Sequence, residues 1–124
     1  MNYRTFVLLS IVLILTFEGR CYAEQTKASY YTEASCKKEG TSGVCANGER
    51  LDDSKYTCAS WKYRFGTLLK VTTQEGRSVV VRVTDRGPGR KALKRGVTID
   101  LSRAAFEAIS PLRKGVIFVN VERY

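Results

Sequence analysis

Apolar and polar residues alternate along two neighbouring segments in the middle of the chain. Residues 66–73 (GTLLKVTT) and 78–85 (SVVVRVTD) both follow this pattern, and the second segment is rich in valine. Alternation with a period of two and a high content of β-branched residues is typical of half-buried strands. Residues 74–77 between them contain Gly76, so the pattern predicts a β-hairpin.

The remaining patterns are shorter. We predict further strands at residues 28–32, 97–101 and 116–121, with the polar, glycine-containing stretch up to residue 60 and the basic stretch at 90–95 as loops. Ser102 is a suitable N-cap for a helix that runs to Ile109, and Pro111 ends that helix. Because strands dominate, the expected architecture is a single domain built as a small β-barrel.

An apolar run precedes this domain. Residues 6–17 (FVLLSIVLILTF) are too few to cross a bilayer, which takes about 20 residues. Arg4 stands before the run and Ala23 after it, which is the layout of a secretory signal. We therefore expect residues 1–23 to be a signal peptide and residues 24–124 to be the mature, exported domain, located in the periplasm or in the extracellular cell wall.

Cys21 follows the apolar run, as an acylated lipoprotein cysteine does. Glu18 and Arg20, however, occupy the positions where lipoprotein processing requires an aliphatic and a small residue. We therefore expect no stable membrane anchor after signal cleavage.

The chain is strongly basic, with 21 Lys and Arg residues against 12 Asp and Glu residues and a formal charge of +9. Removal of the leader lowers the charge only to +8, because Arg4 and Arg20 leave together with Glu18. Such a protein is attracted to polyanions. Export and the absence of an aromatic-basic recognition motif argue against nucleic acid, so an anionic cell wall or membrane surface is the expected partner. A solvated basic face is the alternative.

The mature chain keeps three cysteines, Cys36, Cys45 and Cys58. In an oxidising compartment an odd number predicts one disulfide and one free thiol. A zinc site is not expected, because the chain has no histidine and no closely spaced cysteine pair.

Asp85 and Asp100 are the candidates for acid–base chemistry, because each lies at the end of a predicted strand. Both also have structural alternatives. Asp85 could accept hydrogen bonds from turn amides or pair with Arg86, and Asp100 could cap the following helix. The residues alone leave these alternatives open.

Four short strings occur in a fixed order along the chain: ANGERLD at 46–52, FGT at 65–67, VTDRGP at 83–88 and IDLSRAAF at 99–106. Together they resemble the rare lipoprotein A family, septal-ring lytic transglycosylases built on a six-stranded double-psi β-barrel with one or two short helices. The resemblance covers residues 28–124. The wider group includes expansins, barwin-like proteins and some family-45 glycosidases.

This resemblance implies a polysaccharide lyase that acts on peptidoglycan glycan strands, preferring strands without stem peptides. The bond between N-acetylmuramic acid (MurNAc) and N-acetylglucosamine (GlcNAc) is broken by attack of the muramic acid's own 6-hydroxyl, which leaves a 1,6-anhydro end. No cofactor is implied, and we expect a monomer.

The same resemblance implies roles for individual residues. Asp100 matches the catalytic acid of related barrels, and Asp85 matches its partner. Glu49 and Asp52 match acidic positions that line the glycan groove, although the Asn47-Gly48 turn signal makes a solvated turn the alternative. Arg86 is expected to contact the substrate.

Ser60 departs from the family pattern, because the family usually has histidine at this position. Histidine can share a proton or hydrogen-bond the sugar near neutral pH, whereas serine can only do the second, so Ser60 is expected to bind the substrate. Three functions therefore stay open: an active lytic transglycosylase, an expansin-like wall-binding module without turnover, and a secreted basic interaction protein.

The resemblance also bears on the cysteines, since it implies a disulfide between Cys36 and Cys58, with Cys45 free at a position that is apolar in the family. Four aromatic residues could stack on sugar rings or pack against the barrel: Tyr30, Tyr31, Trp61 and Tyr63.

Overall fold

The computed structural model describes residues 23–34 and 43–124 of the chain. The strands in this part run over the following ranges: β1 Glu24–Tyr31, β2 Thr57–Ser60, β3 Leu68–Thr73, β4 Ser78–Asp85, β5 Val97–Ser102 and β6 Ile117–Arg123. The helices are α2 Arg90–Lys94, α3 Arg103–Ile109 and the short 3₁₀ helix η1 Leu112–Lys114. None of the helices in these residues is long and apolar enough to span a membrane.

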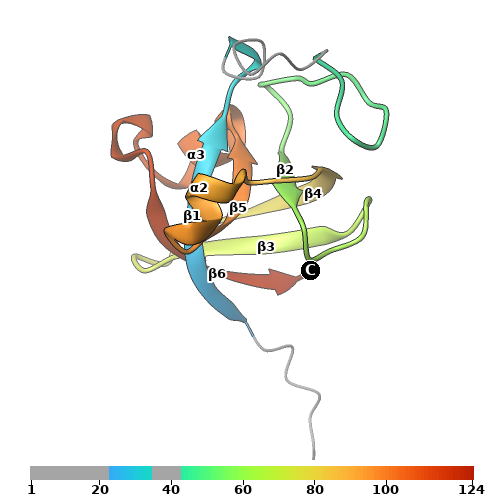
Figure 1. Cartoon of the computed structure of the whole chain (residues 1–124). Helices are drawn as coiled ribbons and strands as arrows, with labels where there is room; N and C mark the ends of the chain where they lie inside the picture. Colours follow the sequence, from blue (N-terminus) through green and yellow to red (C-terminus); the bar gives the residue numbers. More distant parts are fainter. Residues whose placement is uncertain (1–22, 35–42) are drawn as a thin grey trace, which may run out of the picture.

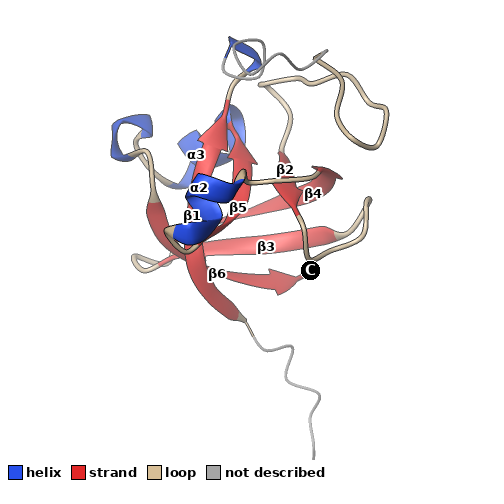
Figure 2. Ribbon diagram, in the orientation of Figure 1, coloured by secondary structure: helices blue, strands red, loops and turns tan. Residues whose placement is uncertain are grey.

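The strands close into a barrel in the order β1-β5-β2-β4-β3-β6, with β6 returning to β1 (Figures 1 and 2). Two neighbouring pairs, β1–β5 and β2–β4, are parallel, whereas the other pairs are antiparallel. Parallel neighbours need long crossover connections. The two crossovers bring residues distant in sequence together on β2, β4 and β5.

The predicted hairpin is confirmed. β3 and β4 pair antiparallel, and Gly76 in their connection has a φ of +90°, a left-handed value that favours glycine. Alternate residues of β4 (Val79, Val81 and Val83) point into the core. The alternation in the sequence therefore marked the correct inner face.

Helix α3 covers one side of the barrel, where it packs against β1, β4 and β5. The side chain of Ser102 accepts a hydrogen bond from the Ala105 amide, which confirms Ser102 as the N-cap. Phe106 is fully buried and packs on Tyr30 with ring centroids 4.8 Å apart. The helix thus closes the core through its apolar face.

Two elements differ from the prediction. Residues 90–94 form the short helix α2 rather than a loop. Residues 57–60 form strand β2, although the sequence predicts a loop there. All four β2 residues are buried, so their strand conformation depends on pairing with β4 and β5 on either side and not on local alternation.

Candidate functional site

Asp85 and Asp100 lie on either side of the same residue, Ala59. Ala59 is the register partner of Asp85 in the β2–β4 pair and of Asp100 in the β2–β5 pair. Directly opposite residues in adjacent strands point to the same face of a sheet. The two carboxylates therefore leave the same face, from backbones about 10 Å apart at the usual strand spacing.

A bulge in β4 makes this arrangement possible. The register with β2 shifts between Cys58 and Ala59, so that Val83 opposes Cys58 and Asp85 opposes Ala59. Strict alternation would have placed Asp85 on the core side with Val83. Because Thr84 is an extra residue in β4, the Asp85 side chain points to the same face as Ala59. Bulges commonly redirect side chains beside functional sites in this way.

Asp85 is held by the backbone. Its Oδ1 accepts hydrogen bonds from the amides of Ala46 (2.9 Å) and Arg86 (2.8 Å). The first bond ties the loop before β2 to the end of β4. The interpretation of Asp85 as an acceptor for turn amides is thus correct, and the same bonds fix the direction of its carboxylate.

Asp100 receives a side-chain hydrogen bond. The hydroxyl of Ser29 donates to its Oδ1 at 3.0 Å, and the two residues are register partners in the β1–β5 pair. The alternative role of Asp100 as a helix cap is wrong, because Ser102 caps α3. Sequence reasoning missed Ser29, and its only signal was a polar residue next to the inward-facing Ala28 within a predicted strand.

Both carboxylates line a groove of about 750 Å³, which we call the carboxylate groove. Its floor includes Ala59 and Tyr31, and one wall is the loop from Arg86 to Gly89. Arg90 and Lys91 of α2 stand on the same wall. The groove therefore offers two acidic groups beside a basic edge, an arrangement suited to a long polar ligand that carries some negative charge.

Arg86 lines the groove but is occupied by the protein itself. Its Nη1 donates to the carbonyl oxygens of Ser60 and Tyr63, both at 2.7 Å. The guanidinium also lies over the Phe65 ring, 4.0 Å from its centroid. These contacts give Arg86 a positioning role, in which it attaches the chain after β2 to the loop that borders the groove.

Ser60 does not lie with the carboxylates. It is buried, it opposes the inward-facing Ile99, and its hydroxyl accepts a hydrogen bond from the Lys62 amide. Because alternate residues of a strand face opposite ways, Ser60 points away from the side that Ala59 occupies.

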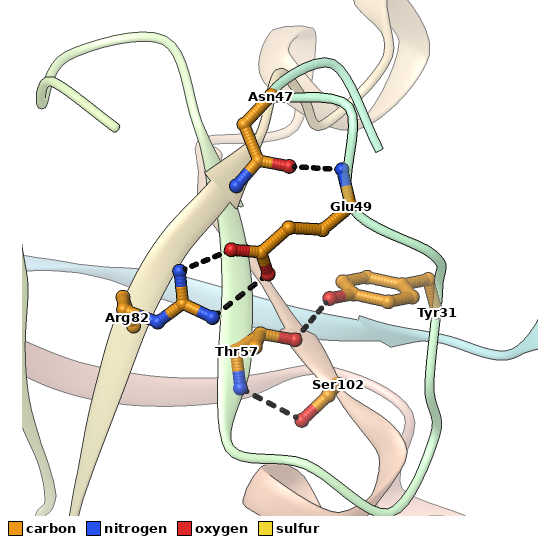
Figure 3. A network of polar contacts seen from close by, with 6 residues as sticks. All are labelled: Tyr31, Asn47, Glu49, Thr57, Arg82 and Ser102. Carbon is orange, nitrogen blue, oxygen red and sulfur yellow. Dashed lines mark hydrogen bonds and ion pairs between the residues drawn. The ribbon is translucent and has the colours of Figure 1, made fainter. Parts of the chain in front are cut away.

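Glu49 is also turned away from the groove. Its two carboxylate oxygens accept hydrogen bonds from both terminal nitrogens of Arg82, each at 2.8 Å (Figure 3). These bonds lower the pKa of Glu49 below its ordinary value of 4.5. The side-chain oxygen of Asn47 accepts a hydrogen bond from the Glu49 amide, and this bond completes the turn. In this arrangement Glu49 secures the turn to β4.

Asp52 has a local role in the structure. Its Oδ1 accepts hydrogen bonds from the amide (2.9 Å) and the hydroxyl (2.5 Å) of Ser54. These bonds lower the pKa of Asp52. Asp52 does not line the carboxylate groove itself but borders an adjoining hollow, which shares Val44 and Leu51 with the groove. The solvated-turn alternative describes this residue well.

A buried polar network connects Tyr31, which lines the groove, with Thr57 and Ser102 (Figure 3). The hydroxyl groups of Tyr31 and Thr57 lie 2.8 Å apart, and the Thr57 amide donates to the Ser102 hydroxyl. Burial raises the pKa of the Tyr31 phenol well above its ordinary value, so the phenol stays protonated. Ser102 thus joins the groove floor to the start of α3.

Of the four aromatic residues, some pack against the barrel and others are exposed enough to stack on a sugar ring. Tyr31 is buried and Tyr30 packs on Phe106, so both belong to the barrel. Trp61 is 60% exposed and donates its indole N–H to the Pro88 carbonyl at 2.8 Å. Tyr63 is partly buried and lies beneath the ammonium of Lys62.

Cys45 is free and buried, as predicted. Cys58 is also a free thiol in the structure, which therefore does not show the predicted disulfide. Burial raises the pKa of Cys58 to about 12, and the charge of Asp100 adds to this effect. Cys36, the predicted partner of Cys58, lies outside the described residues. Among the residues that are described, no three His, Cys, Asp or Glu side chains form a cluster that could hold a metal ion.

The closed six-stranded barrel with two parallel strand pairs is a double-psi β-barrel, here with two carboxylates at one groove. The chain belongs to the rare lipoprotein A family, since the family profile described as lytic transglycolase matches residues 18–121.

Named relatives agree with this assignment. The chain is 36% identical over 102 residues to the endolytic peptidoglycan transglycosylase RlpA of Vibrio cholerae, covering 82% of this chain and 35% of the relative. It is 32% identical over 113 residues to the protein of the same name from Rickettsia prowazekii, covering 85% and 34% respectively. The chain thus spans about a third of the length of these relatives.

Solved structures share the fold. The Streptomyces papain inhibitor superposes with a TM-score of 0.62 at 26% identity, covering 82% of this chain and 93% of the inhibitor. An expansin from Clavibacter michiganensis, solved in complex with cellohexaose, superposes with a TM-score of 0.57 at 21% identity, covering 82% and 50%. The likeness to the expansin concerns the fold alone.

Proposed function

We propose that this protein is an exported lytic transglycosylase that cleaves peptidoglycan glycan strands between MurNAc and GlcNAc. The observation that carries the proposal is the convergence of Asp85 and Asp100 on Ala59 inside one groove. Family membership and the names of the relatives support the same reaction.

Asp100 is assigned the proton transfers. Its carboxyl group gives a proton to the glycosidic oxygen as the bond from C1 of MurNAc to that oxygen breaks, and the oxygen leaves as the GlcNAc hydroxyl. The 6-hydroxyl of the same MurNAc then bonds to C1 and returns its proton to the Asp100 carboxylate. No water is consumed, so one carboxyl group serves both steps.

Asp85 is assigned an electrostatic role. Glycosidic cleavage passes through a transition state in which positive charge develops on the sugar ring. The two amides that hold Asp85 keep its carboxylate directed without freedom to reorient. A fixed negative charge beside the groove stabilises this transition state more than a mobile one, because it needs no reorganisation.

One observation favours a second candidate, a wall-binding module without turnover. Serine replaces the family histidine at position 60 and is buried, and Glu49 is engaged with Arg82. Two side chains that the family resemblance connects with activity are therefore not directed at the groove. Such a module would keep the groove and the basic edge and would bind glycan without cleaving it.

The setting follows from the substrate. Peptidoglycan lies outside the cytoplasm, so the protein is proposed to act as an exported monomer in the periplasm or the cell wall. The preference for glycan without stem peptides belongs to the same proposal.

The deciding experiment incubates the purified mature chain with stem-peptide-free glycan and analyses the products by mass spectrometry. New 1,6-anhydroMurNAc ends, absent with the Asp100→Asn variant, support the transglycosylase. Glycan that is retained by the protein but stays uncut supports the binding module. Absence of both cleavage and binding leaves the secreted interaction protein.

A further inference from the structure

Trp61 is an exposed aromatic residue with a fixed orientation. Its side chain is 60% exposed, yet its indole N–H donates to the Pro88 carbonyl at 2.8 Å. Exposed aromatic side chains usually keep their rotational freedom, which binding would have to remove at an entropic cost. The bond to Pro88 has already removed part of that freedom, so the indole is preorganised for a ligand.

Next to the indole lies a hollow of about 250 Å³, which we call the Trp61 pocket. Apolar side chains make up much of its wall, and Leu93 of α2 is 39% exposed beside it. Hydroxyl groups and an ion pair complete the lining: Ser60, Thr98 and the Glu24–Lys62 pair. The volume is below the roughly 300–1,000 Å³ of typical ligand pockets, so it accommodates one sugar unit or substituent rather than a chain.

The Trp61 pocket and the carboxylate groove lie on two sides of α2. Lys91 and Ala92 line the groove, whereas the next residue, Leu93, lines the pocket. Pro88, which accepts the indole hydrogen bond, borders the groove. A polymer seated in the groove therefore has the Trp61 pocket next to it, across one short helix.

The lining indicates the chemistry of the ligand. The apolar face of a pyranose ring can stack on an indole in the manner of other apolar–aromatic contacts. The methyl of an acetamido group suits the largely apolar wall, to which Leu93 contributes an exposed side chain. A sugar that carries both features is an N-acetylated hexosamine.

We propose that the Trp61 pocket is a glycan-binding subsite that takes an N-acetylated hexosamine unit, outside the carboxylate groove where the bond is broken. This inference rests on the proposed function for the identity of the polymer, and it assigns the pocket a contribution to affinity rather than to chemistry.

Trp61 is the only tryptophan in the sequence, so intrinsic tryptophan fluorescence reports on this pocket directly. The experiment titrates the mature protein with a GlcNAc hexamer and with cellohexaose, which has the same linkage but no acetamido groups. We expect a saturable change in fluorescence with the GlcNAc hexamer at concentrations at least about tenfold lower than with cellohexaose. No fluorescence change, or equal responses to the two hexamers, would overturn the proposal.

Variants measured by calorimetry provide the second test. Trp61→Ala and Leu93→Ala should each weaken binding of the GlcNAc hexamer, the first by about tenfold. Phe118→Ala is the matched control, because Phe118 is 59% exposed and lines a different hollow. Leu93→Ala is needed because Trp61→Ala also removes the hydrogen bond to Pro88. Unchanged affinity in both variants would reject the subsite.

The outcome is separable from that of the proposed function. Binding is measured on a hexamer without MurNAc, whereas cleavage is measured by anhydro ends on stem-peptide-free glycan. A saturable fluorescence change without any cleavage would support the subsite and contradict the proposed transglycosylase activity. Cleavage without a change in Trp61 fluorescence would support the transglycosylase activity and contradict the subsite.

Discussion

The hydroxyl of Ser29 donates a 3.0 Å hydrogen bond to Oδ1 of Asp100, across the parallel pair of β1 and β5. The bond sets the orientation of the carboxyl group to which we assign the proton transfers. Ser29 and Asp100 are 71 residues apart in the chain, so only the barrel topology brings them together.

Ser29→Ala should therefore lower glycan turnover by about two- to tenfold, since a hydrogen bond to the neutral carboxyl group contributes about 0.5–1.5 kcal/mol. Ser29→Thr keeps a hydroxyl and should restore most of the turnover. Release of anhydro ends is the measurement, and Ser78→Ala at the start of β4 is the control. Equal loss in the alanine and threonine variants, with unchanged melting temperatures, would contradict the positioning role.

Asp100→Asn should abolish cleavage while the fold and glycan binding persist, because the amide keeps the shape of the side chain but cannot transfer the proton. Turnover is followed by mass spectrometry and binding by sedimentation with the wall. Asp85→Asn is the comparison variant. If it loses all turnover while Asp100→Asn retains it, the two roles are reversed.

Glu49 should give the protein a stability that depends on pH. The bonds from Arg82 lower the pKa of Glu49 in the folded state below the ordinary 4.5 of the unfolded chain. The stability from this pair is therefore fully present above pH 4.5 and is lost as the pH falls through the lowered folded-state value.

The check compares melting temperatures of wild type and Glu49→Gln between pH 7 and pH 3 at low salt. The difference should be small, because both side chains are exposed, and should shrink toward the acid end. Glu107→Gln on α3 serves as the control for loss of an exposed carboxylate. A difference that grows as the pH falls would argue against the pair.

Binding to intact anionic wall should weaken steadily as the salt concentration rises through the physiological range, because the attraction of a strongly basic protein is screened. Arg90→Gln with Lys91→Gln should weaken binding more than Arg113→Gln with Lys114→Gln, since the first pair lines the groove and the second does not. Pull-down over a salt series measures both effects. Binding that is indifferent to salt would mean that stacking and hydrogen bonds carry the recognition.

The structure has Cys58 as a free thiol and does not describe Cys36, so a disulfide between them in the protein stays a prediction. Peptide mapping of the exported protein without reductant should give a bridge between Cys36 and Cys58. Closing this loop should stabilise the fold by roughly 3 kcal/mol in the chain-entropy account, so Cys36→Ser should melt clearly lower. Cys45→Ser should fold almost normally, and a bridge to Cys45 would contradict the assignment.

The elements that could be predicted from the sequence are those whose signals are local. The alternation over Ser78–Asp85, the turn at Gly76 and the cap at Ser102 all depend on near neighbours, and all three are present in the structure. The order of the sequence strings also identified the family, and with it the barrel. Nothing local predicted β2, because its four residues are buried on all sides by strands from elsewhere in the chain.

Which residues share a site depends on the three-dimensional fold. The bulge before Asp85 changes the face of that side chain, and the parallel crossovers place it opposite Ala59, next to Asp100. The same register turns Ser60 inward. Glu49 accepts hydrogen bonds from Arg82, which is 33 residues away in the chain. Such pairings depend on strand register and barrel closure, in which a shift of one residue reverses every side chain, and a linear pattern does not encode them.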